Sequence, residues 1–117
     1  MGPLLTSVAG IALDDAIGSR TSVHVGCFMH DYETMMTRDP DLPAPYKVTG
    51  TSKSILANRV SWFYDLSGPS VVIDTACSSS LSALHTACHG LHGDDADTVS
   101  KSQSYNPTYI LNRSRRL

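Results

Sequence analysis

One cysteine, Cys77, stands where a short apolar run ends and a helical pattern begins. Residues 71–80 read Val-Val-Ile-Asp-Thr-Ala-Cys-Ser-Ser-Ser, and the residues from Ser78 to Leu91 follow at helical spacing. A sulfur at such a junction lies near unpaired helix N–H groups and the positive end of the helix dipole, which favour the thiolate. The pattern therefore predicts a nucleophile at Cys77. A buried, inert cysteine is the alternative, but the serines that follow favour a reachable sulfur.

Three histidines follow Cys77 on the same predicted helix, with a further cysteine among them. His85 and His89 stand four residues apart, a spacing that places both on one helix face, and His92 and Cys88 lie close to them in sequence. The segment has neither a His-Glu-x-x-His nor a Cys-x-x-Cys pattern, so no metal site is predicted. These histidines are expected to form a solvated or interfacial face.

The sequence near Cys77 contains no obvious base. Asp74 precedes Cys77 by three residues, but a carboxylate aimed at the sulfur would oppose thiolate formation, so we expect Asp74 to hydrogen-bond backbone at the strand end. The serines form no Gly-x-Ser-x-Gly elbow, which makes a serine hydrolase a poor fit. An unrelated thiol enzyme would need His24 or His30 to approach the sulfur, and that alternative stays open.

Composition indicates one small domain with an uneven charge. Of the 117 residues, 41% are hydrophobic and 17% are charged, against about 25% charged in an average globular protein, so much of the chain is expected to be buried. Residues 98–117 contain four basic residues and no acid, whereas the remainder contains five basic and 11 acidic residues. This basic end is short and lacks interleaved aromatic residues, so nucleic-acid binding is not predicted.

The expected compartment is the cytosol. Three cysteines, an odd number, and the lack of a signal-peptide pattern at Met1-Gly2-Pro3 favour a reducing interior. No apolar run approaches the roughly 20 residues of a membrane span, so no membrane partner is expected.

Hydrophobic periodicity predicts an alternation of strands and helices. In the first half of the chain we expect a helix end and loop over Met1–Ser19, a strand over Arg20–Phe28 with Cys27 in the core, and an irregular loop over His30–Tyr46. After it we expect a helix that is capped by Gly50–Ser52 and stopped at Gly68, a buried strand over Ser70–Asp74, and the helix after Cys77. Two strands joined through a helix favour a parallel βαβ crossover. Because parallel sheets normally have several strands covered on both faces, the chain looks like part of a larger α/β fold.

The residues around Cys77 also resemble a known family. Gly68 to His85 reads Gly-Pro-Ser-Val-Val-Ile-Asp-Thr-Ala-Cys-Ser-Ser-Ser-Leu-Ser-Ala-Leu-His, and this resembles the nucleophile segment of the β-ketoacyl synthase (ketosynthase) domain of polyketide synthases, in particular the iterative fungal highly reducing kind. Residues 25–32 and 46–65 are similar to the same domain in register. The similarity runs from about Ala9 to Asp97, a length far more specific than Cys-Ser-Ser-Ser alone.

The resemblance implies a partial thiolase-like α/β fold, an incomplete half of a duplicated α/β/α/β/α arrangement. It implies that Cys77 takes an acyl chain from the phosphopantetheine of an acyl carrier protein as a thioester, with its own N–H as an oxyanion donor. The cysteine then receives the carbanion of a decarboxylating malonyl group in a Claisen condensation of the polyketide or fatty-acid type. In the family, two histidines and a lysine from other segments complete the site, and no cofactor is expected to be bound to the chain itself.

From Val99 the chain departs from the family pattern and becomes polar and turn-rich. We therefore expect a partial β-ketoacyl synthase N-terminal domain over residues 1–97 and a divergent, poorly ordered basic tail over residues 98–117. Because the family's histidines and lysine have no counterpart here, we expect this acyltransferase fragment to be inactive alone. The alternative is a non-catalytic truncated protein that associates with intact synthases through a homodimer-type interface.

Overall fold

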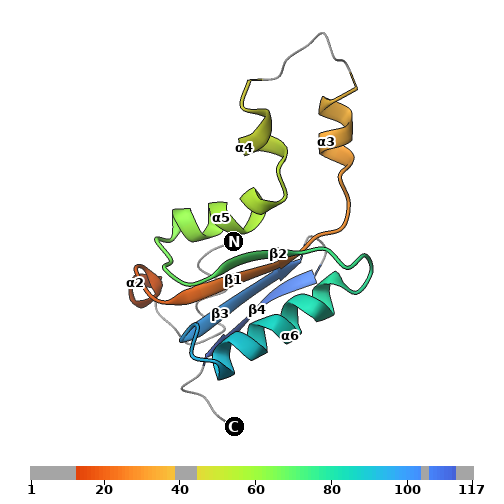
Figure 1. Cartoon of the computed structure of the whole chain (residues 1–117). Helices are drawn as coiled ribbons and strands as arrows, with labels where there is room; N and C mark the ends of the chain where they lie inside the picture. The colour runs from red at the N-terminus through yellow and green to blue at the C-terminus, as the bar shows by residue number, and fades with distance from the viewer. Residues whose placement is uncertain (1–12, 39–44, 104–105, 113–117) are drawn as a thin grey trace.

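Four strands of the described residues form one mixed sheet in the order β2-β1-β3-β4 (Figure 1). The computed structural model describes residues 13–38, 45–103 and 106–112. The strands are β1 (Thr21–Gly26), β2 (Ser70–Ile73), β3 (Thr98–Gln103) and β4 (Asn106–Asn112). β1 pairs in parallel with both β2 and β3, and β4 joins β3 in antiparallel. The predicted parallel crossover from β1 to β2 is confirmed, within a larger sheet than two strands.

β1 lies at the centre of the fold because both of its faces are covered. Val23 and Val25 pack with Ala57 on one face, whereas Ser22 and His24 line a cavity on the other. All six residues of β1 are buried. The alternating pattern in the sequence therefore predicted the strand and its two faces correctly.

Two long helices lie on opposite faces of the sheet (Figure 1). α5 (Ser54–Phe63) packs through Ala57, and α6 (Ser79–His92) packs through Ala83 and Ala87, three alanines without exposed surface. Small side chains at these positions let each helix approach the strands closely. The described part of the chain also contains three short helices, which are α2 (Leu13–Ala16), α3 (Asp31–Met36) and α4 (Lys47–Thr51).

Several sequence-based expectations are wrong in detail. The segment expected to be an irregular loop contains α3, and the part over residues 39–44 lies outside the described residues. The segment expected to cap α5 belongs to α4 and its connection instead, and α5 begins after Lys53 without a side-chain cap.

Two expectations of burial are also wrong. Cys27 is partly exposed rather than in the core. β2 is half-buried because it is an edge strand, so only one neighbouring strand covers it. Of the expected helix end near the N-terminus, residues 1–12 also lie outside the described residues.

Part of the segment predicted to be a basic tail forms strands β3 and β4. β3 adds to the free edge of β1, with Val99 opposite Ser22, and Val99 has no exposed surface. The sequence Thr-Val-Ser-Lys-Ser-Gln lacks an apolar run, but ladder hydrogen bonds use backbone groups that every residue here carries. The sheet therefore crosses the boundary predicted after Asp97.

Candidate active site

Cys77 lies on a sharp turn between the end of β2 and the start of α6. Its side chain is exposed and its thiol is free. The residue before it, Ala76, has φ of 53°, in the left-handed region, which costs a residue with a Cβ about 1–2 kcal/mol. Strain of this kind persists only where the surroundings hold it in place. The turn, called the elbow below and comprising residues 74–79, therefore presents Cys77 to solvent in a fixed conformation.

The serines after Cys77 hold the elbow together. The hydroxyl of Ser79 accepts a hydrogen bond from the backbone N–H of Thr75 at 2.8 Å and donates to the carbonyl of Ala76 at 2.6 Å. The hydroxyl of Ser78 donates to the carbonyl of Thr75 at 2.7 Å. Ser78 and Ser79 are thus structural parts of the turn, in keeping with the preference of serine for turns and helix starts.

The backbone N–H groups at the start of α6 are engaged within the elbow. The N–H of Ser78 donates to the carbonyl of Thr75 at 3.2 Å, and that of Ser79 donates to the carbonyl of Ala76 at 3.1 Å. The sequence-based expectation of unpaired N–H groups is therefore wrong for these two residues. The helix proper begins two residues after Cys77, at Ser79.

Asp74 hydrogen-bonds the backbone, as its position in the sequence predicted. Its Oδ1 accepts from the N–H of Ala76 at 3.3 Å, and its Oδ2 forms an ion pair with the ammonium group of Lys53. The hydrogen bond from Lys53 is the largest influence that lowers the pKa of Asp74, the Ala76 N–H acts in the same direction, and desolvation opposes both. Asp74 is therefore a carboxylate at neutral pH.

Gly26 allows β1 to reach the start of α6. A Cβ built on Gly26 would stand 2.9 Å from the backbone carbon of Ser79 and from the backbone nitrogen of Ser80. No side chain fits in that space, so the close approach needs glycine. The end of β1 and the elbow are therefore packed backbone to backbone.

The histidines on α6 lie away from the elbow. His85 and His89 are exposed and line a cavity of about 360 Å³ together with the buried His24. His92 is exposed as well, and its Nδ1 lies 2.7 Å from the carbonyl oxygen of Cys88. Their expected place on an exposed helix face is confirmed. In the described residues, no three histidine, cysteine or acidic side chains are grouped so that they could hold a metal ion.

The two histidines considered as bases for an unrelated thiol enzyme occupy different places. His24 sits inside β1, and its Nδ1 is buried without a hydrogen-bond partner in the described residues. Burial lowers the pKa of His24. His30 lies near enough to Asp74 for its charge to help lower the pKa of that carboxyl group. Among the hydrogen bonds of the described residues, none joins Cys77 to either histidine.

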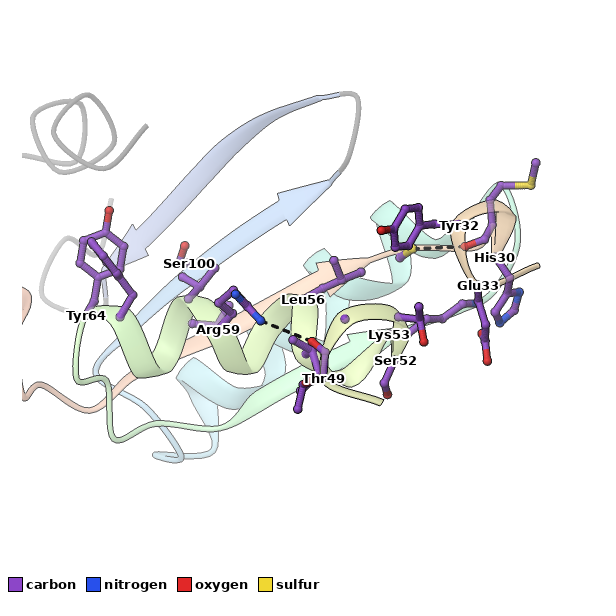
Figure 2. A pocket seen from close by; sticks show the side chains of 18 residues that line it. His30, Tyr32, Glu33, Thr49, Ser52, Lys53, Leu56, Arg59, Tyr64 and Ser100 are labelled. Atoms are coloured by element: carbon purple, nitrogen blue, oxygen red, sulfur yellow. Dashed lines mark hydrogen bonds between the residues drawn. The ribbon is translucent and has the colours of Figure 1, made fainter. Parts of the chain in front are cut away.

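A cavity of about 800 Å³ runs along α5 and does not include Cys77 among its lining residues. Tyr64 and Ser100 lie toward one end of it, and His30, Glu33 and Lys53 lie toward the other (Figure 2). Lys53 connects this cavity to the elbow through its ion pair with Asp74. Sequence reasoning missed Lys53, because its partner lies 21 residues away and no local pattern marks such a contact.

The described residues form an α/β fold, in which a mixed, mainly parallel sheet carries an exposed cysteine on a strand-to-helix elbow. The chain belongs to the β-ketoacyl synthase family, since the family model described as "Beta-ketoacyl synthase, N-terminal domain" matches residues 5–99. The match covers the elbow and ends at the position where the sequence begins to depart from the family pattern. The predicted family is confirmed.

Curated relatives are fungal polyketide synthases. The chain is 54% identical over 106 residues to the hybrid PKS-NRPS synthetase pytA of Aspergillus terreus, and the aligned region covers 88% of this chain and 16% of that protein. It is 51% identical over 91 residues to the compactin diketide synthase mlcB of Penicillium citrinum, covering 78% of this chain and 4% of that one. The chain thus spans a small part of the length of these relatives.

Solved structures with the same fold are ketosynthases. A ketosynthase from module 6 of the bacillaene synthase of Bacillus subtilis 168 matches with a TM-score of 0.63 and 29% identity over 85% of this chain and 16% of that one. The oxazolomycin ketosynthase domain OzmH KS7 of Streptomyces albus JA3453 matches with a TM-score of 0.61 and 35% identity over 85% of this chain and 18% of that one. The predicted partial thiolase-like α/β fold is confirmed at the level of these ketosynthases. In the described residues, no helix is both long and apolar enough to span a membrane.

Proposed function

We propose that this chain supplies the nucleophile-bearing part of a polyketide ketosynthase, and that Cys77 is the residue that accepts the acyl chain. The observation that carries the proposal is the exposed Cys77 on a strained elbow, within the segment matched by the family. Exposure matters because the donor is the thioester of a phosphopantetheine arm on an acyl carrier protein, which must reach the sulfur from outside. We accordingly propose the acyl carrier protein as partner.

The transfer exchanges one thioester for another. The Cys77 sulfur, as thiolate, attacks the acyl carbonyl and forms a new carbon–sulfur bond, and the bond from that carbon to the pantetheine sulfur breaks. The proton that Cys77 gave up ends on the pantetheine thiol, so the step balances without another reactant. The N–H of Cys77 is the proposed donor to the oxygen that becomes negative in the tetrahedral intermediate.

Condensation needs more than these 117 residues supply. In that step a malonyl thioester loses CO₂, and the resulting enolate carbon attacks the Cys77 thioester and releases the cysteine as thiolate. Such an enolate needs groups placed to stabilise its charge. The family's two histidines and lysine have no matching positions here, and in the described residues no hydrogen bond joins Cys77 to a histidine or lysine. We therefore propose that the chain alone accepts acyl groups but does not condense them.

Acyl loading tests the proposal. The purified chain is incubated with hexanoyl-pantetheine, and intact mass followed by peptide mapping locates the added hexanoyl group. We expect acylation at Cys77 faster than at the half-buried Cys27 and Cys88, and its loss in Cys77→Ala. Equal acylation of all three cysteines would contradict the assignment. With labelled malonyl thioester added, no β-ketoacyl product is expected, and clear turnover would refute the claim that condensation needs other segments.

A second candidate function is association with an intact ketosynthase. The observation that favours it is apolar surface left open in the described residues: Trp62 and Phe63 at the end of α5 are 82% and 71% exposed, and Leu81 on α6 is 70% exposed. Exposed aromatic and aliphatic groups of this size are typical of interfaces. Co-purification with a full-length synthase would support this function, and a monodisperse monomer that ignores the synthase would contradict it.

A further inference from the structure

Side chains hydrogen-bond both the N–H and the carbonyl of the strained residue Ala76. Its carbonyl accepts from the hydroxyl of Ser79, the first residue of α6. Its N–H donates to Oδ1 of Asp74, whose other oxygen pairs with Lys53 at the start of α5. Because α5 and α6 lie on opposite faces of the sheet (Figure 1), the elbow is tied to both helical layers.

We propose that Lys53 and Asp74 are positioning residues for Cys77. The ion pair fixes the direction of the Asp74 carboxylate, the carboxylate fixes the Ala76 N–H, and Ala76 thereby stays in the left-handed conformation that presents the next residue to solvent. Neither side chain takes part in the acyl transfer itself. This inference rests on the proposed function of Cys77 and adds two residues that act through its backbone.

The local surroundings make the pair suited to this task. The side chain of Lys53 is 19% exposed and that of Asp74 is 41% exposed, so the lysine is held mainly by the protein and the carboxylate stays partly hydrated. His30 is the other titratable group whose charge acts on Asp74. A carboxylate accepts a backbone N–H more strongly than a neutral oxygen does, so the hold on Ala76 depends on the charge of Asp74.

The reactivity of Cys77 should therefore depend on the ion pair between Lys53 and Asp74. If the pair is broken, Ser79 still holds the Ala76 carbonyl, but the N–H side of the elbow is released and Ala76 can relax out of the left-handed region. The Cys77 sulfur then samples several directions. Small displacements of a reacting group are costly to rate. Cys88 lies within α6 and does not line the cavity that Lys53 lines, whereas Cys27 does.

The test uses the full chain with Lys53→Met, Lys53→Arg, Asp74→Asn and Asp74→Glu, and with Lys47→Met as the matched control, because Lys47 is an exposed lysine on α4. Hexanoyl-pantetheine loading and iodoacetamide alkylation are measured at each of the three cysteines by peptide mass spectrometry. Cys88 serves as the internal reference in the same molecule, and Cys27 is followed beside it because it lines the same cavity as Lys53. The ratio of the Cys77 rate to the Cys88 rate separates positioning from general loss of fold, which would change both rates together.

We expect Lys53→Met and Asp74→Asn to lower the Cys77 loading rate roughly tenfold, with an unchanged rate at Cys88. Lys53→Arg keeps the charge and is expected to restore most of the rate, and Lys47→Met should match the unmodified chain. Unchanged Cys77 loading in Lys53→Met, with loading still abolished in Cys77→Ala, would overturn the positioning role and leave the proposed function intact. A parallel rise at all three cysteines would also overturn it. If the unmodified chain is not acylated, the proposed function fails, and the alkylation ratio decides the positioning role.

Discussion

The hydroxyl of Ser79 lies 2.8 Å from the backbone nitrogen of Thr75 and 2.6 Å from the carbonyl oxygen of Ala76. Ser79 is 2% exposed. Its hydroxyl therefore pairs, away from solvent, with the N–H of the residue before the strained Ala76 and with the carbonyl of Ala76 itself. This arrangement joins the end of β2 to the first turn of α6, and it explains why a helix start without a side-chain cap bond carries a serine at its first helical position.

Replacing Ser79 with alanine should loosen the elbow and lower stability. The change removes the acceptor of the Thr75 N–H and one of the donors to the Ala76 carbonyl. The loss of these two hydrogen bonds should reduce the free energy of unfolding by about 1–2 kcal/mol. Urea unfolding followed by circular dichroism measures this loss. Ser78→Ala is the matched control, because the Ser78 hydroxyl donates within the same turn but is exposed. An equal loss for the two variants would contradict the role given to the buried hydroxyl.

Replacing Gly26 with alanine should push β1 away from the elbow. The added Cβ would stand 2.9 Å from backbone atoms of Ser79 and Ser80, which cannot rotate aside as a side chain can. We expect a loss of about 1–3 kcal/mol in the free energy of unfolding and a changed Cys77 alkylation rate. Thermal and urea unfolding measure the first quantity.

Gly90 provides the control for this substitution. A Cβ there meets no atom within 4 Å, and the position lies inside α6. Gly90→Ala should raise stability by about 0.5–1 kcal/mol through helix propensity. If Gly26→Ala were as harmless as Gly90→Ala, the close backbone packing at the end of β1 would be refuted.

The sequence was informative where a local pattern determines the structure. The alternation through Val23 and Val25 predicted β1 with its two faces, and the apolar run followed by serines predicted the β2-to-α6 junction at Cys77. These features depend on periodicity and on turn chemistry, which a short window of residues contains.

The sequence was uninformative where distant segments decide the structure. Val99 is buried only because β1 offers a free edge, and the polar residues around it carry no strand pattern of their own. The contact of Lys53 with Asp74 joins two segments that only the tertiary fold brings together. The φ of Ala76 is likewise imposed by its surroundings, because alanine has no preference for that region.

Buried His24 should make the protein less stable in mild acid. Desolvation lowers its pKa in the folded state below the usual value of 6.5, so the unfolded chain binds a proton that the folded chain rejects. The free energy of unfolding is therefore unaffected by His24 above about pH 6.5, and it declines as the pH falls from there toward the pKa of His24 in the folded state. The other titratable residues that line the same cavity are His85, His89 and Asp95.

Urea unfolding between pH 7.5 and 5 measures this dependence. His24→Gln should flatten the decline, whereas His92→Gln, at an exposed position that does not line this cavity, should leave it nearly unchanged. A nuclear magnetic resonance titration of the unmodified protein gives the folded pKa of His24 directly and does not require the variant to fold. A value at or above 6.5 would contradict the expected direction.

Removing the residues after Asp97 should unfold the sheet rather than trim a tail. The truncated chain loses β3 and β4, and with them the side chain of Val99 and the whole ladder along one edge of β1. The unpaired N–H and C=O groups of a central, buried strand would then face solvent or other chains. We expect the chain ending at Asp97 to lose its cooperative urea transition and to aggregate, as measured by circular dichroism and light scattering.

A chain ending at Asn112 is the matched control, because it removes the three terminal arginines but keeps both strands, and its transition should persist. If the chain ending at Asp97 unfolds with the same midpoint as the full chain, the first 97 residues form the stable unit on their own and the pairing of β3 with β1 contributes nothing to it.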